Sequence, residues 1–163
     1  MKESSLIKAF KKYVPKEMRC KSGDRRAAVS ILLTNTQHGL EMLMVNRVVK
    51  SSDPWSGQIA FPGGMAKNTD TSLLHTAMRE TSEEVGLIVD KEYFLGALCD
   101  VKTHFNKVIV TPYVAFKRNL GDLKLNSELV RGFLVPIKIF NNRQFRTFKV
   151  EPGIKRRKIC SIF

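Results

Sequence analysis

The chain has 163 residues, of which 43% are hydrophobic, a size that suits one compact domain with a substantial core. No stretch approaches the ~18 consecutive apolar residues of a membrane-spanning helix, and the N-terminus lacks the apolar segment of a signal peptide. The formal net charge of +13 has two explanations: a positive field that attracts a phosphorylated nucleotide, or a solubility feature with incidental nucleic-acid affinity. Because nothing in the chain resembles the aromatic-interleaved signature of an RNA-binding module, specific nucleic-acid recognition is the weaker hypothesis.

The first predicted elements are a helix and three strands. Lysines alternate with apolar residues over the first twelve positions, which is typical of a short amphipathic helix. Residues 27–33 and 40–47 are predicted strands, joined by a polar turn at 35–39. A short apolar run at 59–61 predicts a third strand, which the turn-forming sequence Pro62-Gly63-Gly64 ends.

The second half of the chain predicts a longer pair of strands, at 95–101 and 107–116. Pro112 has no N–H to donate, so we expect the second of these strands to bulge there or to lie at an edge. Residues 133–135 predict a further strand, and residues 136–140 a brief helix. Residues 146–150 could add a last strand.

Neither an internal repeat, nor a low-complexity tract, nor a linker divides the chain, so we predict a single domain over residues 1–163. Its core is expected at 25–140, after an N-terminal helical extension over 1–24 and before a basic tail over 152–163. The predicted strands, together with one central helix and further helices outside them, predict a three-layer α/β/α sandwich. Three cysteines without metal-type spacing predict free thiols in a reducing compartment. The missing membrane span and signal peptide predict a soluble cytoplasmic protein. Cys99 stands in an apolar run and is expected in the core.

The most informative segment is the helix predicted after Asp70, which Gly86 ends as a left-handed stop. Glu80, Glu83 and Glu84 stand at i, i+3 and i+4, so their charges crowd on one side of the helix unless a cation lies among them. From the triplet alone, a divalent metal site and a solvated acidic face are equally good explanations. The neighbouring face carries a predicted buried stripe of Leu74, Ala77, Met78, Thr81 and Val85.

Residues 64–87 resemble a Nudix box, in which Gly, five residues, Glu and seven residues precede Arg-Glu, an apolar residue, any residue, Glu-Glu, any residue, Gly and an apolar residue. Arg79 to Leu87 match its second half, except that Thr81 stands at the apolar position. In the first half Asp70 replaces the expected Glu, and one extra residue separates it from Arg79. Asp70 is therefore expected to cap the helix or to bond a loop amide.

A longer match, from Trp55 to Gly64, resembles the segment that precedes the box in the coenzyme A pyrophosphatase branch of the family, which also tolerates the extra residue. That branch carries a second arginine about five residues after an arginine such as Arg47. This chain has Ser52 there, with Lys50 nearby. The substrate assignment therefore depends on the segment in which the chain departs from the branch.

The resemblance implies a Nudix-type α/β/α sandwich with a mixed sheet, and a metal-dependent pyrophosphohydrolase that cleaves a nucleoside diphosphate derivative, first of all coenzyme A or an acyl-CoA. ADP-ribose, oxidised nucleoside triphosphates and dinucleoside polyphosphates remain alternative substrates. A non-catalytic Nudix module that binds RNA or a protein is the other alternative, although such modules typically lose motif glutamates and this chain keeps all three. The family includes monomers and dimers, so a homodimer stays open, and no membrane partner is expected.

The same resemblance implies roles for individual residues. Mg²⁺ or Mn²⁺ is expected on Glu80, Glu83, Glu84 and the Gly64 carbonyl, since both ions prefer oxygen ligands. Glu80 is the first candidate for the general base, and Arg79 is expected to orient the glutamates by ion pairing. Glu128 could add a metal ligand or a base, the alternative being an exposed acid that begins a short helix. The predicted substrate-binding residues are Arg47, Lys50, Trp55 and Gly63, and His104 is a weaker candidate.

Overall fold

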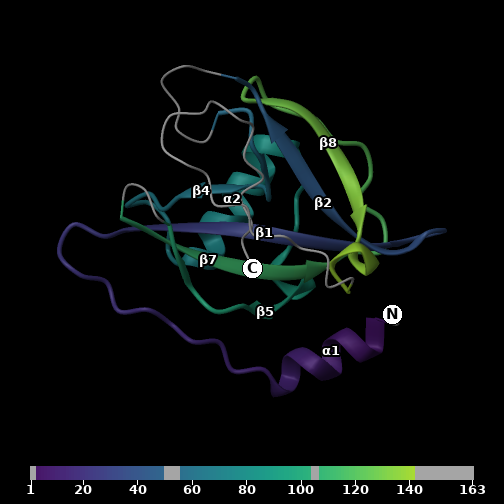
Figure 1. The fold of residues 1–163 in the computed structure, drawn as a ribbon, viewed down its shortest axis with the longest axis horizontal. Helices are drawn as coiled ribbons and strands as arrows, with labels where there is room; N and C mark the ends of the chain where they lie inside the picture. Colours follow the sequence, from purple (N-terminus) through teal and green to yellow (C-terminus); the bar gives the residue numbers. More distant parts are fainter. Residues whose placement is uncertain (1–2, 50–55, 104–106, 142–163) are drawn as a thin grey trace.

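The structure, a computed structural model, describes residues 3–49, 56–103 and 107–141 (Figure 1). Within the described residues, no helix is long and apolar enough to cross a membrane. In chain order the elements are α1 (Glu3–Lys12), β1 (Arg25–Thr36), β2 (Gly39–Arg47), β3 (Ile59–Ala60), β4 (Gly63–Met65), α2 (Leu73–Val85), the 3₁₀ turn η1 (Lys91–Tyr93), β5 (Phe94–Ala97), β6 (Val101–Lys102), β7 (Val108–Phe116), β8 (Leu129–Pro136) and the 3₁₀ turn η2 (Ile137–Asn141).

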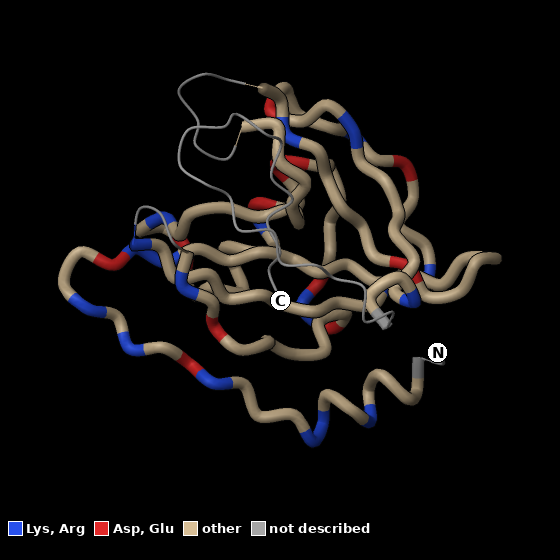
Figure 2. The backbone as a smooth tube through the Cα atoms, viewed as in Figure 1, with Lys and Arg blue, Asp and Glu red and all other residues tan. Residues whose placement is uncertain are grey.

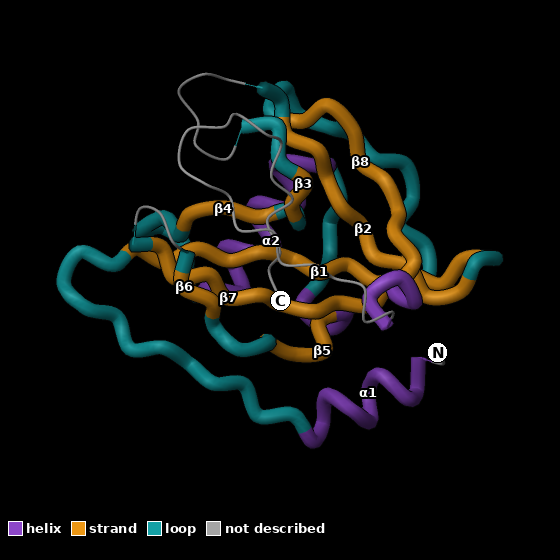
Figure 3. The backbone as a smooth tube through the Cα atoms, viewed as in Figure 1, coloured by secondary structure: helices purple, strands orange, loops and turns teal. Residues whose placement is uncertain are grey.

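The strands form one mixed sheet in which the central order is β3-β2-β1-β7-β5. β1 pairs in parallel with β7, whereas its pairing with β2 is antiparallel and confined to the hairpin end, from Leu33↔Met42 to Thr36↔Gly39. Beyond the hairpin the two strands diverge, with β4 along β1 and β3 along β2, while β8 also pairs with β2 (Figure 3). The turn between β3 and β4 therefore lies where β1 and β2 separate.

Side chains of β1 alternate between two hydrophobic clusters, one on each face of the sheet. Leu32 packs in a cluster with Val85 of α2. Its neighbours Ile31 and Leu33 pack instead with Leu6 of α1. Helix α1, the sheet and α2 are thus three layers, as the sequence pattern predicts.

Among the described residues, the expected strands form, with one exception. The predicted strand at 95–101 is split into β5 and β6, and the break faces Pro112, whose carbonyl accepts the Leu98 N–H at 2.8 Å. The prediction for Pro112 itself is wrong. β7 pairs with β1 on one side and with β5 and β6 on the other, and the register shift falls in β5. The missing N–H of Pro112 is accommodated by an interruption of the partner strand. The predicted strand at 146–150 and the basic tail lie outside the described residues.

The segment after α1, residues 13–24, is the N-terminal arm, and basic residues recur along it (Figure 2). It is bonded to the break between β5 and β6: the Met18 N–H donates to Asp100 at 2.9 Å, and the Lys16 N–H to the Cys99 sulfur at 3.2 Å. Cys99 is exposed, so its expected place in the core is wrong. It stands where the strand is interrupted, which leaves its thiol accessible beneath the arm.

Candidate active site

Helix α2 presents the acidic residues because its caps and its apolar face fix its rotation. Ser72 accepts the His75 N–H at 3.1 Å as N-cap, and Gly86 ends the helix at φ +70°. Ala77, Thr81 and Val85 of the predicted stripe are buried, whereas Leu74 and Met78 are only partly so. Thr76 and Glu84 are buried as well, which the periodic pattern does not predict.

Glu84 is the buried member of the triplet, with 5% of its side chain exposed against 48% for Glu83. Its Oε2 accepts the Gly63 N–H at 2.9 Å, and its Oε1 lies 3.5 Å from Arg47 Nη1. Burial raises the pKa of Glu84 to about 7, although the Gly63 hydrogen bond and the Arg47 charge oppose the rise. A cation at this carboxylate would favour its charged form.

Arg79 connects the other two glutamates to a buried aspartate. Its Nε and Nη2 each donate to Asp70 at 2.9 Å, and its Nη1 donates to Glu80 and, at 3.0 Å, to Glu83. The Arg79 guanidinium holds the pKa of Asp70 well below its ordinary range. Asp70 also accepts the Lys67 N–H at 2.9 Å. Of its two expected roles, the bond to a loop amide is therefore confirmed, whereas the N-cap is Ser72.

Gly63 and Gly64 follow the bend at Pro62 and begin strand β4, so the predicted turn is shorter than expected; these two glycines, the glycine turn, fit against the cluster because they lack side chains. A Cβ on Gly63 would lie 2.4 Å from the Ala28 carbonyl oxygen. One on Gly64 would lie 2.6 Å from Glu80 Cδ. The turn is therefore in contact with β1 on one side and with the Glu80 carboxylate on the other.

The donor set suits a hard divalent cation, since Glu80, Glu83, Glu84 and the Gly64 backbone supply only oxygen ligands and the turn touches Glu80. As the side chains stand, however, no three acid, His or Cys side chains in the described ranges are placed to hold an ion together. Arg79 bonds to Glu80 and Glu83, and Arg47 lies beside Glu84. Binding an ion would require these carboxylates to turn from their arginines.

The remaining predicted residues are only partly described. Arg47 Nη2 lies 3.7 Å from Glu128 Oε2, which brings Glu128 into the same cluster as Glu84. The Glu128 N–H donates to Asn126 Oδ1 at 2.9 Å in a turn that leads into β8. The alternative for Glu128 is therefore wrong about the short helix, but right that the acid is exposed, since half of its side chain is. Lys50, Trp55 and His104 lie outside the described residues.

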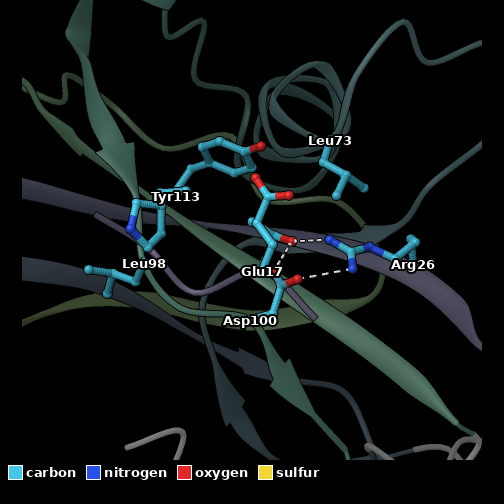
Figure 4. Close-up of a pocket in the computed structure, with 9 residues that line it drawn as sticks. Glu17, Arg26, Leu73, Leu98, Asp100 and Tyr113 are labelled. Carbon is cyan, nitrogen blue, oxygen red and sulfur yellow. Dashed lines mark hydrogen bonds and ion pairs between the residues drawn. The ribbon is translucent and has the colours of Figure 1, made fainter. Parts of the chain in front are cut away.

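A second polar cluster, built on Asp100, is absent from the sequence-based expectations. Its carboxylate faces Arg26 (Figure 4), with 3.0 Å between Arg26 Nη1 and Asp100 Oδ2. It also accepts the Thr111 hydroxyl. The cluster lines a cavity of about 110 Å³ with Tyr113 and Leu73 and contains no residue of the predicted site. No sequence signal connects Arg26 to Asp100, because only strand pairing brings them together.

The NUDIX domain family model matches residues 24–151, which include the glycine turn and the whole of α2. The chain belongs to the Nudix family. A mouse relative, "Mitochondrial coenzyme A diphosphatase NUDT8", is 35% identical over 109 residues, which are 67% of this chain and 50% of that protein. A second, "Uncharacterized Nudix hydrolase NudL" of Photorhabdus laumondii, is 30% identical over 82% of this chain and 71% of its own length. The chain spans half or less of the length of several of these curated relatives.

Solved structures of Nudix proteins share the fold. The NUDIX domain of Shewanella oneidensis NrtR, complexed with ADP ribose, aligns with a TM-score of 0.61 at 20% identity, over 86% of this chain and 87% of that one. A MutT/nudix family protein from Enterococcus faecalis aligns with the same TM-score at 17% identity, over 82% of this chain and 56% of that one. The α/β/α sandwich with a mixed sheet is thereby confirmed as the Nudix fold.

Proposed function

We propose that the chain is a divalent-metal-dependent pyrophosphohydrolase that cleaves the diphosphate bond of a nucleoside diphosphate derivative. One observation carries the proposal: the Nudix helix keeps all three glutamates beside a glycine turn that contacts Glu80 and donates to Glu84. The name of the mouse relative, a coenzyme A diphosphatase, supports coenzyme A or an acyl-CoA as the first substrate to test. Residues 1–163 then act as one catalytic domain, with a core over 25–140.

The chemistry follows from the charge of the substrate. Bound Mg²⁺ or Mn²⁺ would neutralise the phosphate oxygens and lower the pKa of the attacking water. Glu80, Glu83, Glu84 and the Gly64 carbonyl would hold the ions, and Glu80 is the first candidate to accept the proton of that water. Arg79 is a positioning residue, because its contacts are to Asp70 and to the glutamates. Arg47 could donate its planar fork to a phosphate oxygen.

A second substrate class is kept open by the segment between Arg47 and Gly57. The coenzyme A branch places a second arginine there, and this chain has Ser52 instead. ADP-ribose, oxidised nucleoside triphosphates and dinucleoside polyphosphates present the same diphosphate to the same helix. Lys50 and Trp55, proposed for substrate binding, belong to this segment.

A substrate panel with Mg²⁺ or Mn²⁺, with products separated by chromatography, tests the proposal. Release of 4′-phosphopantetheine and adenosine 3′,5′-bisphosphate from coenzyme A would support the branch assignment. Glu83→Gln should abolish most of the metal-dependent activity, whereas Glu92→Gln, an exposed acid on η1, should leave it intact. Wild-type protein inactive on the whole panel would favour a non-catalytic binding module.

A further inference from the structure

The solvent-facing side of the glutamate triplet carries a lysine, Lys67, to which the proposed function so far gives no role. Its Nζ lies 3.4 Å from Glu83 Oε2, and within the described part of the chain this is the one polar contact of the ammonium group. About half of each side chain is exposed, 54% for Lys67 and 48% for Glu83. Because Glu84 is buried and Glu83 is not, solvent reaches the triplet from the side of this ion pair.

The backbone of Lys67 is held on both sides, so the side chain is the part that can move. The preceding Ala66 N–H donates to the Arg26 carbonyl at 3.0 Å, which ties the loop to β1. The Lys67 N–H donates to Asp70 Oδ2 at 2.9 Å, and the Lys67 carbonyl accepts the Asp70 N–H at 3.0 Å. The loop between β4 and α2 therefore presents a flexible, positively charged side chain from a fixed point beside Glu83.

The ion pair between Lys67 and Glu83 can open at little cost. An exposed lysine–glutamate pair stabilises a protein by about 1 kcal/mol or less, because water solvates both charges when the pair separates. Glu83 Oε2 also accepts a shorter bond, 3.0 Å, from Arg79 Nη1. Neither the ammonium nor the carboxylate is therefore left as a buried, unpaired charge when Lys67 turns away.

We propose that Lys67 is a phosphate-binding residue of the site, which pairs with Glu83 in the metal-free protein and turns to a phosphate oxygen of the substrate once Glu83 holds a divalent cation. The inference rests on the proposed function and deepens it, because it adds a substrate contact from the loop before α2, whereas Arg47 approaches Glu84 from β2. A diphosphate is an anion, and a lysine ammonium binds phosphate as a point charge. With Glu83 engaged by the cation, that phosphate replaces the carboxylate as the partner of Lys67.

Calorimetric titration of the Mg²⁺-loaded full-length chain with methylenediphosphonate, a diphosphate analogue that is not hydrolysed, tests the inference without turnover. Lys67→Gln is expected to weaken binding of the analogue about fivefold, since one exposed charge contact is lost. Lys91→Gln is the matched control: it removes the same charge from an exposed position on η1 and should change the affinity less than about twofold. Lys67→Arg keeps the charge and should retain most of the affinity.

Titration with Mn²⁺ alone, followed by electron paramagnetic resonance, separates the possible failures. Lys67→Gln should bind Mn²⁺ at least as tightly as wild type, because the lysine and the cation compete for Glu83. Weaker binding of both Mn²⁺ and the analogue would make Lys67 a structural residue and overturn this inference alone. So would an analogue affinity that is equal in Lys67→Gln and Lys91→Gln while Glu83→Gln still weakens Mn²⁺ binding. Mn²⁺ binding that Glu83→Gln does not weaken would overturn the proposed function and this inference together.

Discussion

The carboxylate of Asp70 holds the guanidinium of Arg79 through two hydrogen bonds, each 2.9 Å long, and that guanidinium bonds in turn to Glu80 and Glu83. Asp70→Asn removes the negative charge and leaves Arg79 partly uncompensated. Because the pair is largely buried, we expect the free energy of unfolding to fall by about 3 kcal/mol in urea titrations. Asp90→Asn, at an exposed position with no side-chain capping bond, should have little effect. Equal stability of the two variants would contradict the structural role of Asp70.

The lowered pKa of Asp100 predicts that the protein loses stability in acid. Burial raises its pKa, but the bonds from the Met18 N–H, the Thr111 hydroxyl and Arg26 outweigh burial and hold the pKa below its ordinary 3.8. A depressed folded pKa stabilises the protein above about pH 4, and this contribution is lost as the pH falls through the folded pKa. Asp100→Asn should therefore lower the free energy of unfolding by about 2 kcal/mol at pH 7 and by progressively less towards pH 3.

Urea titrations at pH 7, 5 and 3 measure that difference, and Asp122→Asn, an exposed aspartate, is the control. The same substitution replaces one of the two acceptor oxygens with an NH₂ group, so the Met18 N–H and the Thr111 hydroxyl no longer both have an acceptor, and trypsin should cut the N-terminal arm at Arg19 and Lys21 faster than in wild type. A stability difference that grows as the pH falls would show that the pKa of Asp100 is raised instead.

Local chemistry explains which parts of the fold the sequence could predict. The left-handed stop at Gly86 and the buried positions Ala77, Thr81 and Val85 depend on residues within one helix, and they appear where the pattern places them. The split of the 95–101 strand depends on its neighbour β7, and Asp100 meets Arg26, 74 residues away, only through the pairing of three strands. Such contacts leave no periodic signal.

The same distinction between local and long-range contacts explains which features of the candidate site the sequence could predict. The spacing of Glu80, Glu83 and Glu84 places them on one helix, but nothing in that spacing makes Glu84 the buried one. Its burial depends on the glycine turn, whose Gly63 N–H reaches it from 21 residues away. The sequence leaves two roles for Asp70, capping the helix or bonding a loop amide, and does not predict its bond to Arg79, because the extra residue obscures the match to the motif.

Glu84→Gln is expected to stabilise the metal-free protein while removing activity. Burial raises the pKa of Glu84 from 4.5 to about 7, so the folded state loses stability relative to the unfolded one as the pH rises from about 4.5 to 7. The neutral amide of the variant does not carry this cost. Its free energy of unfolding should exceed that of wild type by up to about 3 kcal/mol at pH 8 and differ little at pH 5. Thermal melts at both pH values check the sign, and metal-dependent hydrolysis should fall about a hundredfold.

Gly64→Ala should impair hydrolysis more than folding. Its Cβ would lie 2.6 Å from Glu80 Cδ, so the Glu80 carboxylate must move. Gly132→Ala is the control because it creates a similar steric clash away from the acidic residues: its Cβ would lie 2.6 Å from Leu123 Cδ1. We expect Gly64→Ala to lower kcat about tenfold or more while its secondary structure stays the same as in wild type. Gly132→Ala should instead lower the melting temperature and leave kcat unchanged. The opposite distribution would place Glu80 outside the chemistry.

Thr81 occupies the apolar position of the motif, and its hydroxyl meets a partner on β1. Thr81 Oγ1 lies 2.8 Å from Ser30 Oγ and 2.8 Å from the Ala77 carbonyl oxygen, and neither Thr81 nor Ser30 is exposed. Thr81→Val removes one partner and leaves the Ser30 hydroxyl with only the Ala77 carbonyl, 3.2 Å away. We expect each of Thr81→Val and Ser30→Ala to cost about 1 to 2 kcal/mol in urea titrations.

The double variant decides whether the two hydroxyls act as a pair. If they do, the double variant Ser30→Ala with Thr81→Val should lose about 1 kcal/mol less free energy of unfolding than the two single variants lose together. The reason is that the second substitution removes a hydroxyl that has already lost its hydrogen-bond partner to the first. Thr34→Val is the matched control: Thr34 is buried on the same strand and donates to the Arg118 carbonyl at 3.0 Å. It lies roughly 13 Å from Ser30 along β1, so its cost should add to that of Ser30→Ala. Additive costs in both pairs would mean that the hydroxyls of α2 and β1 contribute independently, and that no direct bond between Thr81 and Ser30 helps to set the rotation of the helix that carries Glu80, Glu83 and Glu84.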